Sequence, residues 1–292
     1  MPFQPSYEVP EPRRAYTING EVEKRGMENG RIGCLILHGF MGSPVSSRDM
    51  AQFLAQHGIT VHCPLLPGHG NLPYMLHNVS RRDWIAEAEE ALAKLLQTVD
   101  QIFIMGHSMG AVLGAYLTNK SSDIRGLIML APLYDVPDPR IKLAWLGKYF
   151  MPWFYPLKHK DADNEIFLGR VKDFNPDIDI HDPSLSDWLM QATRIPLSGV
   201  AQMVAMSRLG RRLWPRLNIP VLILQGEEDP AVSPDTSKKI LDLIPGSDKW
   251  LELFPDTGHE LMRTFDPVHK KVWHLVQQFI SERVSVRTAA SS

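Results

Sequence analysis

The sequence predicts one α/β domain whose mostly parallel β-sheet is covered by helices on both faces. From Arg31 onward, short β-branched apolar runs alternate with longer stretches of helical periodicity, which is the pattern of strand–helix–strand units. The alternation stops between Leu133 and Pro215, where prolines and scattered aromatics replace it, and then resumes. This break indicates an insertion between sheet strands, and a chain of 292 residues is long enough for one large core with such an insertion.

Six short apolar runs are the expected strands. They are Gly33–Leu37, Thr60–Cys63, Gln101–Met105, Gly126–Leu130, Val221–Gln225 and Trp250–Phe254. Open α/β sheets bind their ligands in the loops at the carboxyl ends of the strands. The segments that follow these runs are therefore the expected positions of functional residues.

Three helices are predicted together with their start signals. The helix over Ser80–Val99 begins with a capping box, because Ser80 and Asp83 have the required spacing. Its apolar residues recur at steps of three and four: Ile85, Ala88, Leu92, Leu95 and Val99. Ser233-Pro234 and Asp266-Pro267 each place a capping side chain before a proline at the first helical position, which predicts two later helices.

The same pattern predicts the domain organisation. Residues 16–132 and 216–284 are expected to form the core, and residues 133–215 an inserted cap. The polar, proline-rich residues 1–15 and the tail 285–292 are expected to be mobile. Most of the cap's aromatic residues are expected to form a small core of the cap itself, and a minority, represented by Trp153 and Phe154, to line an acyl pocket.

Composition narrows the class of protein. The formal net charge of −2 gives no overall attraction for nucleic acid or for an anionic membrane, so a small-molecule partner is expected. No secretion signal and no apolar run long enough to span a bilayer are present, which predicts a cytoplasmic protein without stable membrane insertion. Cys34 and Cys63 both lie in apolar segments that are predicted to be buried strands. Two reduced thiols are expected, and a disulfide between them is the alternative.

The strongest chemical signal is Gly106-His107-Ser108-Met109-Gly110, which lies between an apolar run and a helical segment. A serine nucleophile needs its hydroxyl exposed at a tight strand-to-helix turn, and small residues two positions before and after it let that turn close. The context therefore predicts that Ser108 is a catalytic nucleophile.

Serine is a weak nucleophile at neutral pH, so a histidine must take its proton and a carboxylate must orient that histidine. The histidines after Ser108 are His159, His181, His259, His269 and His274. His159 and His181 fall in the insertion, and the last two fall in a predicted helix, whereas His259 follows a strand in a loop. We therefore predict that His259 is the general base.

The carboxylate is expected to follow the strand over Val221–Gln225. Asp229 is the main candidate, because it follows this strand and keeps the order nucleophile, acid, base along the chain, whereas Asp256, only three residues before His259, is expected to cap its own turn. Glu227 and Glu228 in the same turn and Asp256 in the histidine loop are the alternatives.

An oxyanion hole needs two backbone N–H groups. Met109, directly after the nucleophile, supplies one, and Phe40 in the glycine-rich segment after the first strand is expected to supply the other. His38 in that segment is expected to be a buried structural residue and not a catalytic one.

Taken together, these motifs resemble the carboxylesterase and monoacylglycerol lipase group of the α/β-hydrolase superfamily over roughly Arg31 to Ile280. The motifs are His38-Gly39-Phe40-Met41-Gly42-Ser43-Pro44, Leu66-Pro67-Gly68-His69-Gly70, Asp83-Trp84, Gly106 to Gly110, Gly226 to Asp229 with Val232, and Gly258-His259-Glu260. One departure is Ala111, where this group often has a glycine.

The resemblance implies the α/β-hydrolase fold with an eight-stranded, mostly parallel sheet, a helical cap, and neither cofactor nor metal. It also implies hydrolysis of short to medium acyl esters or monoacylglycerols through an acyl-enzyme. The same triad could instead serve a lactonase, an amidase, a C–C hydrolase or a perhydrolase, since the fold hosts them all. A non-catalytic protein that binds a ligand in the same pocket is a further alternative.

Overall fold

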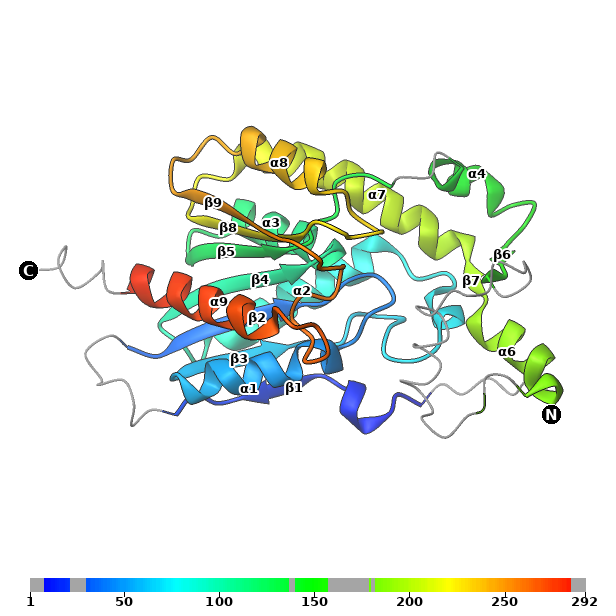
Figure 1. Ribbon diagram of the computed structural model, residues 1–292, viewed down its shortest axis with the longest axis horizontal. Coiled ribbons are helices and arrows are strands. Elements are labelled where there is room, and N and C mark those ends of the chain that lie inside the picture. The colour runs from blue at the N-terminus through cyan, green and yellow to red at the C-terminus, as the bar shows by residue number, and fades with distance from the viewer. Residues whose placement is uncertain (1–7, 22–29, 137–139, 157–178, 180–181, 285–292) are drawn as a thin grey trace, which may run out of the picture.

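The protein is a twisted β-sheet with helices on both faces and an additional group of short elements at one end (Figure 1). The computed structural model describes residues 8–21, 30–136, 140–156, 179 and 182–284. In chain order the strands of the main sheet are β1 (Tyr16–Ile18), β2 (Ile32–Leu37), β3 (Ile59–Cys63), β4 (Gln101–His107), β5 (Ile124–Leu130), β8 (Val221–Gly226) and β9 (Lys249–Phe254). The strand order across the sheet is β1-β3-β2-β4-β5-β8-β9.

All six predicted strands are present, and each is extended by at most a few residues at its ends. They pair in parallel, as predicted, whereas β1 pairs antiparallel with β3 at the edge. Within the described residues the sheet has seven strands, so the expected count of eight is not met. The sequence did not indicate β1, because a strand of three residues with only Tyr16 buried carries no periodic signal.

Alternate strand residues bury against different helices. Leu35 and Leu37 of β2 belong to a core shared with helices α2 (Arg81–Leu96), α3 (Met109–Lys120) and α8 (Pro234–Leu243). Cys34 and Ile36 of the same strand belong to a second core, with α1 (Arg48–Gln56) and α9 (His269–Val284). The predicted three-layer arrangement is therefore confirmed.

The helix starts agree in part with the predicted signals. At α2 the capping box is present: the Ser80 hydroxyl accepts from the Arg82 N–H at 3.2 Å and the Asp83 carboxylate from the Ser80 N–H at 2.8 Å. Pro234 begins α8, but the Ser233 side chain makes no capping bond.

Helix α9 begins at His269 and not at Pro267. The preceding residues form a separate turn in which the Asp266 carboxylate accepts from the Val268 N–H at 3.1 Å. The Asp266 carbonyl also accepts from the His269 N–H at 3.1 Å. Asp266 therefore organises the turn that leads into the helix.

The described part of the segment between β5 and β8 (131–136, 140–156, 179 and 182–220) is mainly helical, and it contains one long helix that was not expected. Helix α7 (Leu197–Leu213) has 17 residues and packs along α3 before the chain returns to β8 (Figure 1). Small residues form much of its buried face, so its sequence shows no apolar stripe: Gly199, Ala201, Ser207 and Gly210. The other elements are η6 (Ile141–Leu143), α4 (Ala144–Gly147), β6 (Trp153–Phe154), η8 (Pro183–Leu185), α6 (Ser186–Thr193), β7 (Ile195–Pro196) and η9 (Trp214–Arg216).

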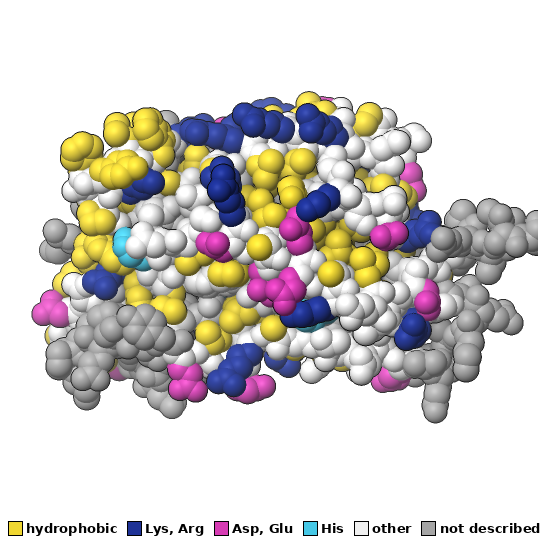
Figure 2. Space-filling model, turned by 180° about the vertical axis from the view of Figure 1, so that it is seen from behind, with side chains coloured by type: hydrophobic (Ala, Val, Ile, Leu, Met, Phe, Trp, Pro, Cys, Tyr) yellow, Lys and Arg dark blue, Asp and Glu magenta, His cyan; other side chains and the backbone are white. Residues whose placement is uncertain are grey.

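The aromatic residues of this segment differ from expectation. Trp145, Tyr149, Phe150 and Phe154 are exposed and do not form a small core. Apolar side chains accordingly gather at the end of the molecule that carries α4, at the upper left of the view from behind (Figure 2). The expectation failed because residue type alone does not reveal which apolar side chains find a packing partner.

Three further expectations concern segments outside the sheet. Part of the N-terminal segment that was expected to be mobile makes a defined contact, since the Asn71 side chain donates to the Glu8 carbonyl at 2.6 Å. Residues 1–7 and 285–292 lie outside the described residues. Cys34 and Cys63 are buried and free, as predicted for a reduced pair. None of the described helices has both the length and the apolar content that a bilayer-spanning segment requires.

Candidate active site

Ser108 lies at a strained turn between β4 and α3. Its backbone has φ of +54° and ψ of −114°, a left-handed conformation that few non-glycine residues adopt. Two glycines allow this turn. A Cβ on Gly106 would lie 2.4 Å from the Gly110 carbonyl group, and a Cβ on Gly110 would lie 1.9 Å from the Leu37 carbonyl oxygen. The turn is also tied to the neighbouring strand, because the Ser108 N–H donates to the Leu130 carbonyl at 2.8 Å.

Asp229 and His259 meet at the carboxyl edge of the sheet. His259 Nδ1 lies 2.7 Å from Asp229 Oδ2. The Asp229 side chain is fully buried, and its other oxygen accepts from the N–H groups of Ala231 and Val232 at 2.7 and 2.9 Å. Gln225 Nε2 donates to Oδ2 at 3.1 Å. These four bonds fix the carboxylate in one orientation.

The same contacts determine protonation. Burial acts to raise the pKa of Asp229, but the hydrogen bond and charge of His259 and the N–H groups of Val232 and Ala231 together outweigh it, and the pKa lies below its ordinary value. An ionised carboxylate can only accept, so Nδ1 of His259 carries the hydrogen and Nε2 is left as the basic atom. The His259 side chain is 19% exposed, and it lines the same pocket as Ser108.

Close backbone packing brings the acid and the base together. A Cβ on Gly226 would lie 2.3 Å from the carbonyl oxygens of both Thr257 and Gly258. The Glu228 N–H also donates to the Thr257 carbonyl at 3.0 Å. The turn after β8 and the loop after β9 therefore touch only because position 226 has no side chain.

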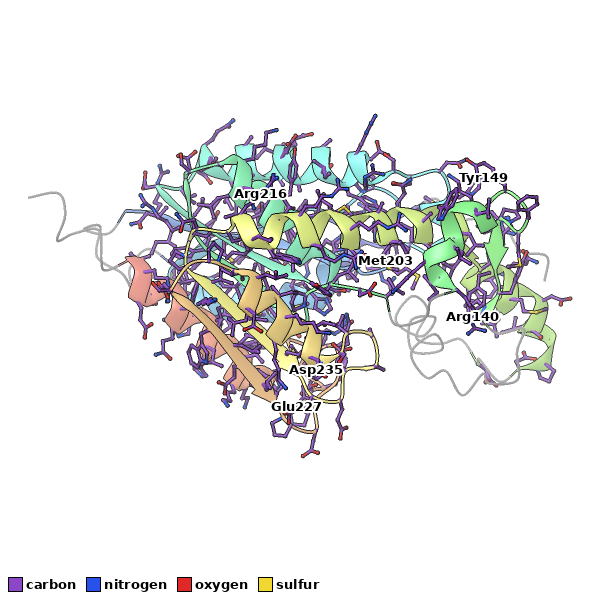
Figure 3. The ribbon with its side chains drawn as sticks, turned by 90° about the horizontal axis from the view of Figure 1, so that it is seen from above. Arg140, Tyr149, Met203, Arg216, Glu227 and Asp235 are labelled. Atoms are coloured by element: carbon purple, nitrogen blue, oxygen red, sulfur yellow. The ribbon has the colours of Figure 1, made fainter. Side chains whose placement is uncertain are left out.

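The alternative acids lie elsewhere. Glu227, Glu228 and Asp256 are exposed. Figure 3 shows Glu227 in the turn after β8, near Asp235 of α8. The structure thus pairs His259 with Asp229 and with none of the three alternatives. Among the other histidines, His269 and His274 lie in α9, while His159 and His181 fall outside the described residues.

The loop after β2 lies directly against the nucleophile. A Cβ on Gly39 would lie 3.2 Å from Ser108 Cβ, and the Gly42 N–H closes the turn by donating to the Gly39 carbonyl at 3.0 Å. Phe40 lies in this turn, and Met109 is the first residue of α3, where a backbone N–H has no acceptor within its own helix. Phe40 lines the same pocket as Ser108, and Met109 directly follows Ser108 in the chain.

His38 is buried, as expected, and both of its ring nitrogens are used by the backbone. The Leu66 N–H donates to Nε2 at 3.1 Å, so the hydrogen must lie on Nδ1, which donates to the Gly39 carbonyl at 3.0 Å. Burial lowers the pKa of His38 to about 3, so the ring stays neutral. Because the Gly39 carbonyl and the Phe40 N–H belong to one peptide unit, His38 orients the Phe40 N–H.

His107 is a site residue that the sequence did not indicate. Its Nε2 donates to the His259 carbonyl at 2.9 Å, and the two rings lie 4.7 Å apart. Burial lowers its pKa, which keeps the ring neutral. The one signal in the sequence was a histidine at the end of a predicted buried strand, but the G-x-S-x-G motif allows any residue type at position 107.

The pocket contains neither of the predicted cap residues. Its lining comes from the loop after β2, the turn that carries Ser108, the loop that carries His259 and the N-terminal segment. It includes Arg13, Phe40, Ser46, Ser108, His259 and Arg263. Trp153 contacts the His77 ring, at 4.9 Å between centroids, and the Arg194 guanidinium, at 4.3 Å, while Phe154 is 42% exposed. Their role in binding substrate stays a prediction. Over the described ranges no group of three or more side chains is arranged to hold a metal ion.

Comparison with known proteins agrees with this geometry. Residues 29–266 match the family model described as serine aminopeptidase, S33. The chain belongs to this family. The match includes β2 to β9 and thus every residue of the pocket except Arg13.

Relatives of this S33 family member include a thermostable monoacylglycerol lipase of Bacillus sp. (strain H-257), which is 27% identical over 86% of this chain and 92% of the relative. The carboxylesterase of Bacillus subtilis is 20% identical over 86% of this chain and 94% of the relative. A solved structure of the metagenome-derived lipolytic enzymes LipS and LipT has a TM-score of 0.74 at 22% identity and covers 94% of this chain and 100% of that chain. The monoacylglycerol lipase of Paleococcus ferrophilus has a TM-score of 0.67 at 18% identity, covering 93% and 98%. The fold is therefore the α/β-hydrolase fold.

Proposed function

We propose that this chain is a serine hydrolase that cleaves carboxylic esters, with Ser108 as nucleophile, His259 as general base and Asp229 as the orienting acid. The observation that carries the proposal is the 2.7 Å contact between His259 Nδ1 and Asp229 Oδ2. The same His259 lines one pocket with the strained Ser108. A buried carboxylate, an imidazole with a free Nε2 and a serine at a left-handed turn are the parts that acyl transfer requires.

In the first half of the reaction, Ser108 Oγ attacks the ester carbonyl carbon and passes its proton to His259 Nε2. The carbonyl oxygen becomes an oxyanion, which accepts hydrogen bonds from the Phe40 and Met109 N–H groups. Asp229 stabilises the imidazolium that forms. Collapse of the intermediate breaks the bond to the alcohol oxygen, which takes the proton from His259 and leaves as the alcohol.

In the second half, water attacks the carbonyl carbon of the acyl-enzyme and gives a proton to His259. The same two N–H groups accept the second oxyanion. Its collapse releases the carboxylic acid and returns the proton to Ser108 Oγ, so the enzyme is restored without a cofactor.

The substrate class is proposed to be monoacylglycerols or short to medium acyl esters. A monoacylglycerol lipase and a carboxylesterase each align with 86% of this chain, and the monoacylglycerol lipase is the more similar of the two, at 27% against 20% identity. The cytoplasmic location expected from the sequence stays a prediction.

Labelling by a fluorophosphonate tests the nucleophile, because this reagent reacts with an activated serine. The wild type should be labelled at Ser108 and Ser108→Ala should not. Absence of labelling in a folded wild type would instead favour a protein that only binds a ligand. A kinetic screen over esters of graded chain length, a monoacylglycerol, a lactone and an aminoacyl anilide then tests the bond type, and faster cleavage of the anilide would favour the peptidase named in the family description.

A further inference from the structure

Two arginines from distant parts of the chain line the pocket that holds Ser108. Arg13 is the last residue of η1 (Glu11–Arg13), and Arg263 belongs to the segment after β9. Glu260 is the only acidic side chain among the described residues of this lining, so two positive charges and one negative charge leave a net charge of +1, histidines not counted. Neither arginine takes part in the proposed acyl transfer. A net positive lining therefore indicates a preference among substrates that the triad alone does not explain.

Arg263 is held at the pocket by a turn whose middle residues are buried. The Arg263 N–H donates to the Glu260 carbonyl at 2.9 Å. Leu261 and Met262 between them belong to the core that α9 shares, and the Met262 carbonyl accepts from Trp273 Nε1 of that helix at 2.9 Å. The buried residues fix the turn, and its two charged ends line the pocket.

Arg13 is brought to the pocket by an N-terminal segment that is fixed on both sides of η1. Before it, the Asn71 side chain donates to the Glu8 carbonyl at 2.6 Å. After it, the hydroxyl groups of Tyr16 and Ser47 are hydrogen-bonded at 2.8 Å, and Ser47 lies in the segment after β2 against which η1 packs. Arg13 precedes residues 29–266, the part of the chain that matches the family model, so this side of the pocket lies outside the shared region.

Both guanidinium groups are placed to meet a dissolved ligand. Arg13 and Arg263 are half-buried and are not part of the core. The Arg263 guanidinium lies 5.4 Å from the centre of the Phe265 ring, which is 69% exposed, so it is at the surface of the protein. A guanidinium group stays ionised at neutral pH, and its planar set of donors fits a carboxylate or a phosphate.

The proposed reaction places the alcohol portion of the substrate on the side of Arg263. His259 Nε2 gives its proton to the alcohol oxygen as the alcohol leaves, so the alcohol lies next to the loop after β9. Arg263 is in the same segment and lines the same pocket. A negative charge on the alcohol portion, and not one on the acyl chain, is therefore the charge that this arginine would contact.

We propose that Arg13 and Arg263 bind an anionic group, a phosphate or a carboxylate, on the alcohol portion of the ester. The substrates that suit this chain best are then acyl esters of anionic alcohols, such as an acylated glycerol phosphate, ahead of the corresponding neutral monoacylglycerols. This inference rests on the proposed function, because it specifies the substrate class of the same pocket. Charge-assisted hydrogen bonds to an anion are stronger than bonds to a neutral hydroxyl group, so the two arginines discriminate between such esters.

Matched esters test the proposal. The kcat/KM of the full chain is measured for butyrylglycerol phosphate and its neutral parent monobutyrin, and for butyryl glycolate and its neutral parent, the butyryl ester of ethylene glycol. The ratio of anionic to neutral kcat/KM should be about ten or more for at least one pair, and the pair with the larger ratio identifies phosphate or carboxylate. Arg13→Gln and Arg263→Gln should each lower this ratio by about five- to tenfold. The loss should lie in KM, because the anion is bound alike in the ground state and the transition state.

The matched control is Arg31→Gln. Arg31 pairs with Asp100 at 3.5 Å and precedes β2, at the amino edge of the sheet and away from the pocket, so the ratio should not change. Arg263→Lys keeps the charge but not the planar donors, and it should retain part of the preference. Salt at about 0.5 M should lower the ratio of the wild type, since it screens charges that solvent reaches.

Two results would overturn the inference: a wild type that prefers neither anionic ester, or arginine variants that lose the same factor on the anionic and neutral members of a pair. Calorimetric binding of the uncleaved esters to the full chain carrying Ser108→Ala separates the two proposals. If the wild type cleaved no ester, but Ser108→Ala bound the anionic ester more tightly and lost this difference on adding Arg263→Gln, the anion site would stand and the hydrolytic function would fail. Cleavage of the neutral esters without any preference for the anionic ones would leave the function and reject the anion site.

Discussion

Two loops at the carboxyl edge of the sheet lie on either side of Ser108, and each contains a histidine in a different condition. His38, after β2, is buried, and backbone groups occupy both of its ring nitrogens. His259, after β9, uses one nitrogen to bind Asp229 and keeps the other on the side of the pocket. The first histidine can only hold the backbone, whereas the second can accept and return a proton. The number of occupied ring nitrogens, more than the distance from Ser108, separates the two roles.

The largest expected effect comes from removing the proton path. Ser108→Ala and His259→Ala should each lower kcat for ester hydrolysis by roughly 10⁵- to 10⁶-fold, and the double variant should be little worse, because the two groups act as one unit. Steady-state kinetics on a chromogenic ester measures this. Losses that multiply in the double variant would show that the two residues act independently.

The next effect concerns the partner of His259. Asp229→Asn is nearly isosteric but favours the wrong tautomer of the histidine, so kcat should fall by about 10⁴-fold. Asp256→Asn, in the same loop as His259 but exposed, is the matched control and should change kcat by no more than a few-fold. Near-normal turnover of Asp229→Asn with an inactive control would move the acid to position 256.

A smaller effect is expected at the other histidine. His38→Gln should lower kcat by about ten- to a hundredfold, less than the full loss of an oxyanion donor, because the peptide that carries the Phe40 N–H loses one support but keeps the bond from Gly42. His57→Gln is the control. His57 also donates to a backbone carbonyl, that of Phe53 at 2.8 Å, but it lies at the C-terminal end of α1 and not in the loop after β2. A loss as large as that of His259→Ala would instead make His38 part of the proton path.

The smallest effect is on stability as a function of pH. The pKa of His38 is about 3 in the folded chain against an ordinary value of 6.5, so below 6.5 the unfolded chain binds a proton that the folded chain does not. The free energy of unfolding should therefore fall as the pH drops from about 6.5 toward 3, with His107 adding to the fall in the same direction.

Urea unfolding at a series of pH values measures this dependence. His38→Gln should be less stable at pH 7 by about 1 to 3 kcal/mol, since buried partners lose their hydrogen bonds, and its stability should depend less on pH above 4. Parallel curves for the wild type and the variant would mean that His38 is not held neutral.

The comparison of the two loops also separates what the sequence could predict. A strand buried on both faces is apolar throughout, so β2, β4 and β8 stood out. The turn after the strand Val221–Gln225 favoured Asp229, but the order nucleophile, acid, base is the same for Glu228 and Asp256, so only the structure separates them. The pairing of His107 with the His259 carbonyl joins positions far apart in the chain, and no local pattern carries it.

The cap was the least predictable part. Helix α7 buries small residues and so lacks an apolar stripe. Trp145 and Phe150 have the composition of a core, yet α4 packs on α7 through Ala144 and leaves them outside. Which side of a short helix faces inward is decided by its neighbours, and a single sequence does not contain that information in a local form.

Gly226 contributes nothing that reacts, binds or titrates. It nevertheless fixes the spacing between acid and base, because the carbonyls of Thr257 and Gly258 occupy the space that any side chain would need. A survey of side-chain chemistry would pass over this position, although a single added methyl group there would separate Asp229 from His259 and leave every reactive group intact. We therefore expect sequences that keep this triad to keep a glycine at the end of the acid strand, for a reason that is purely one of clearance.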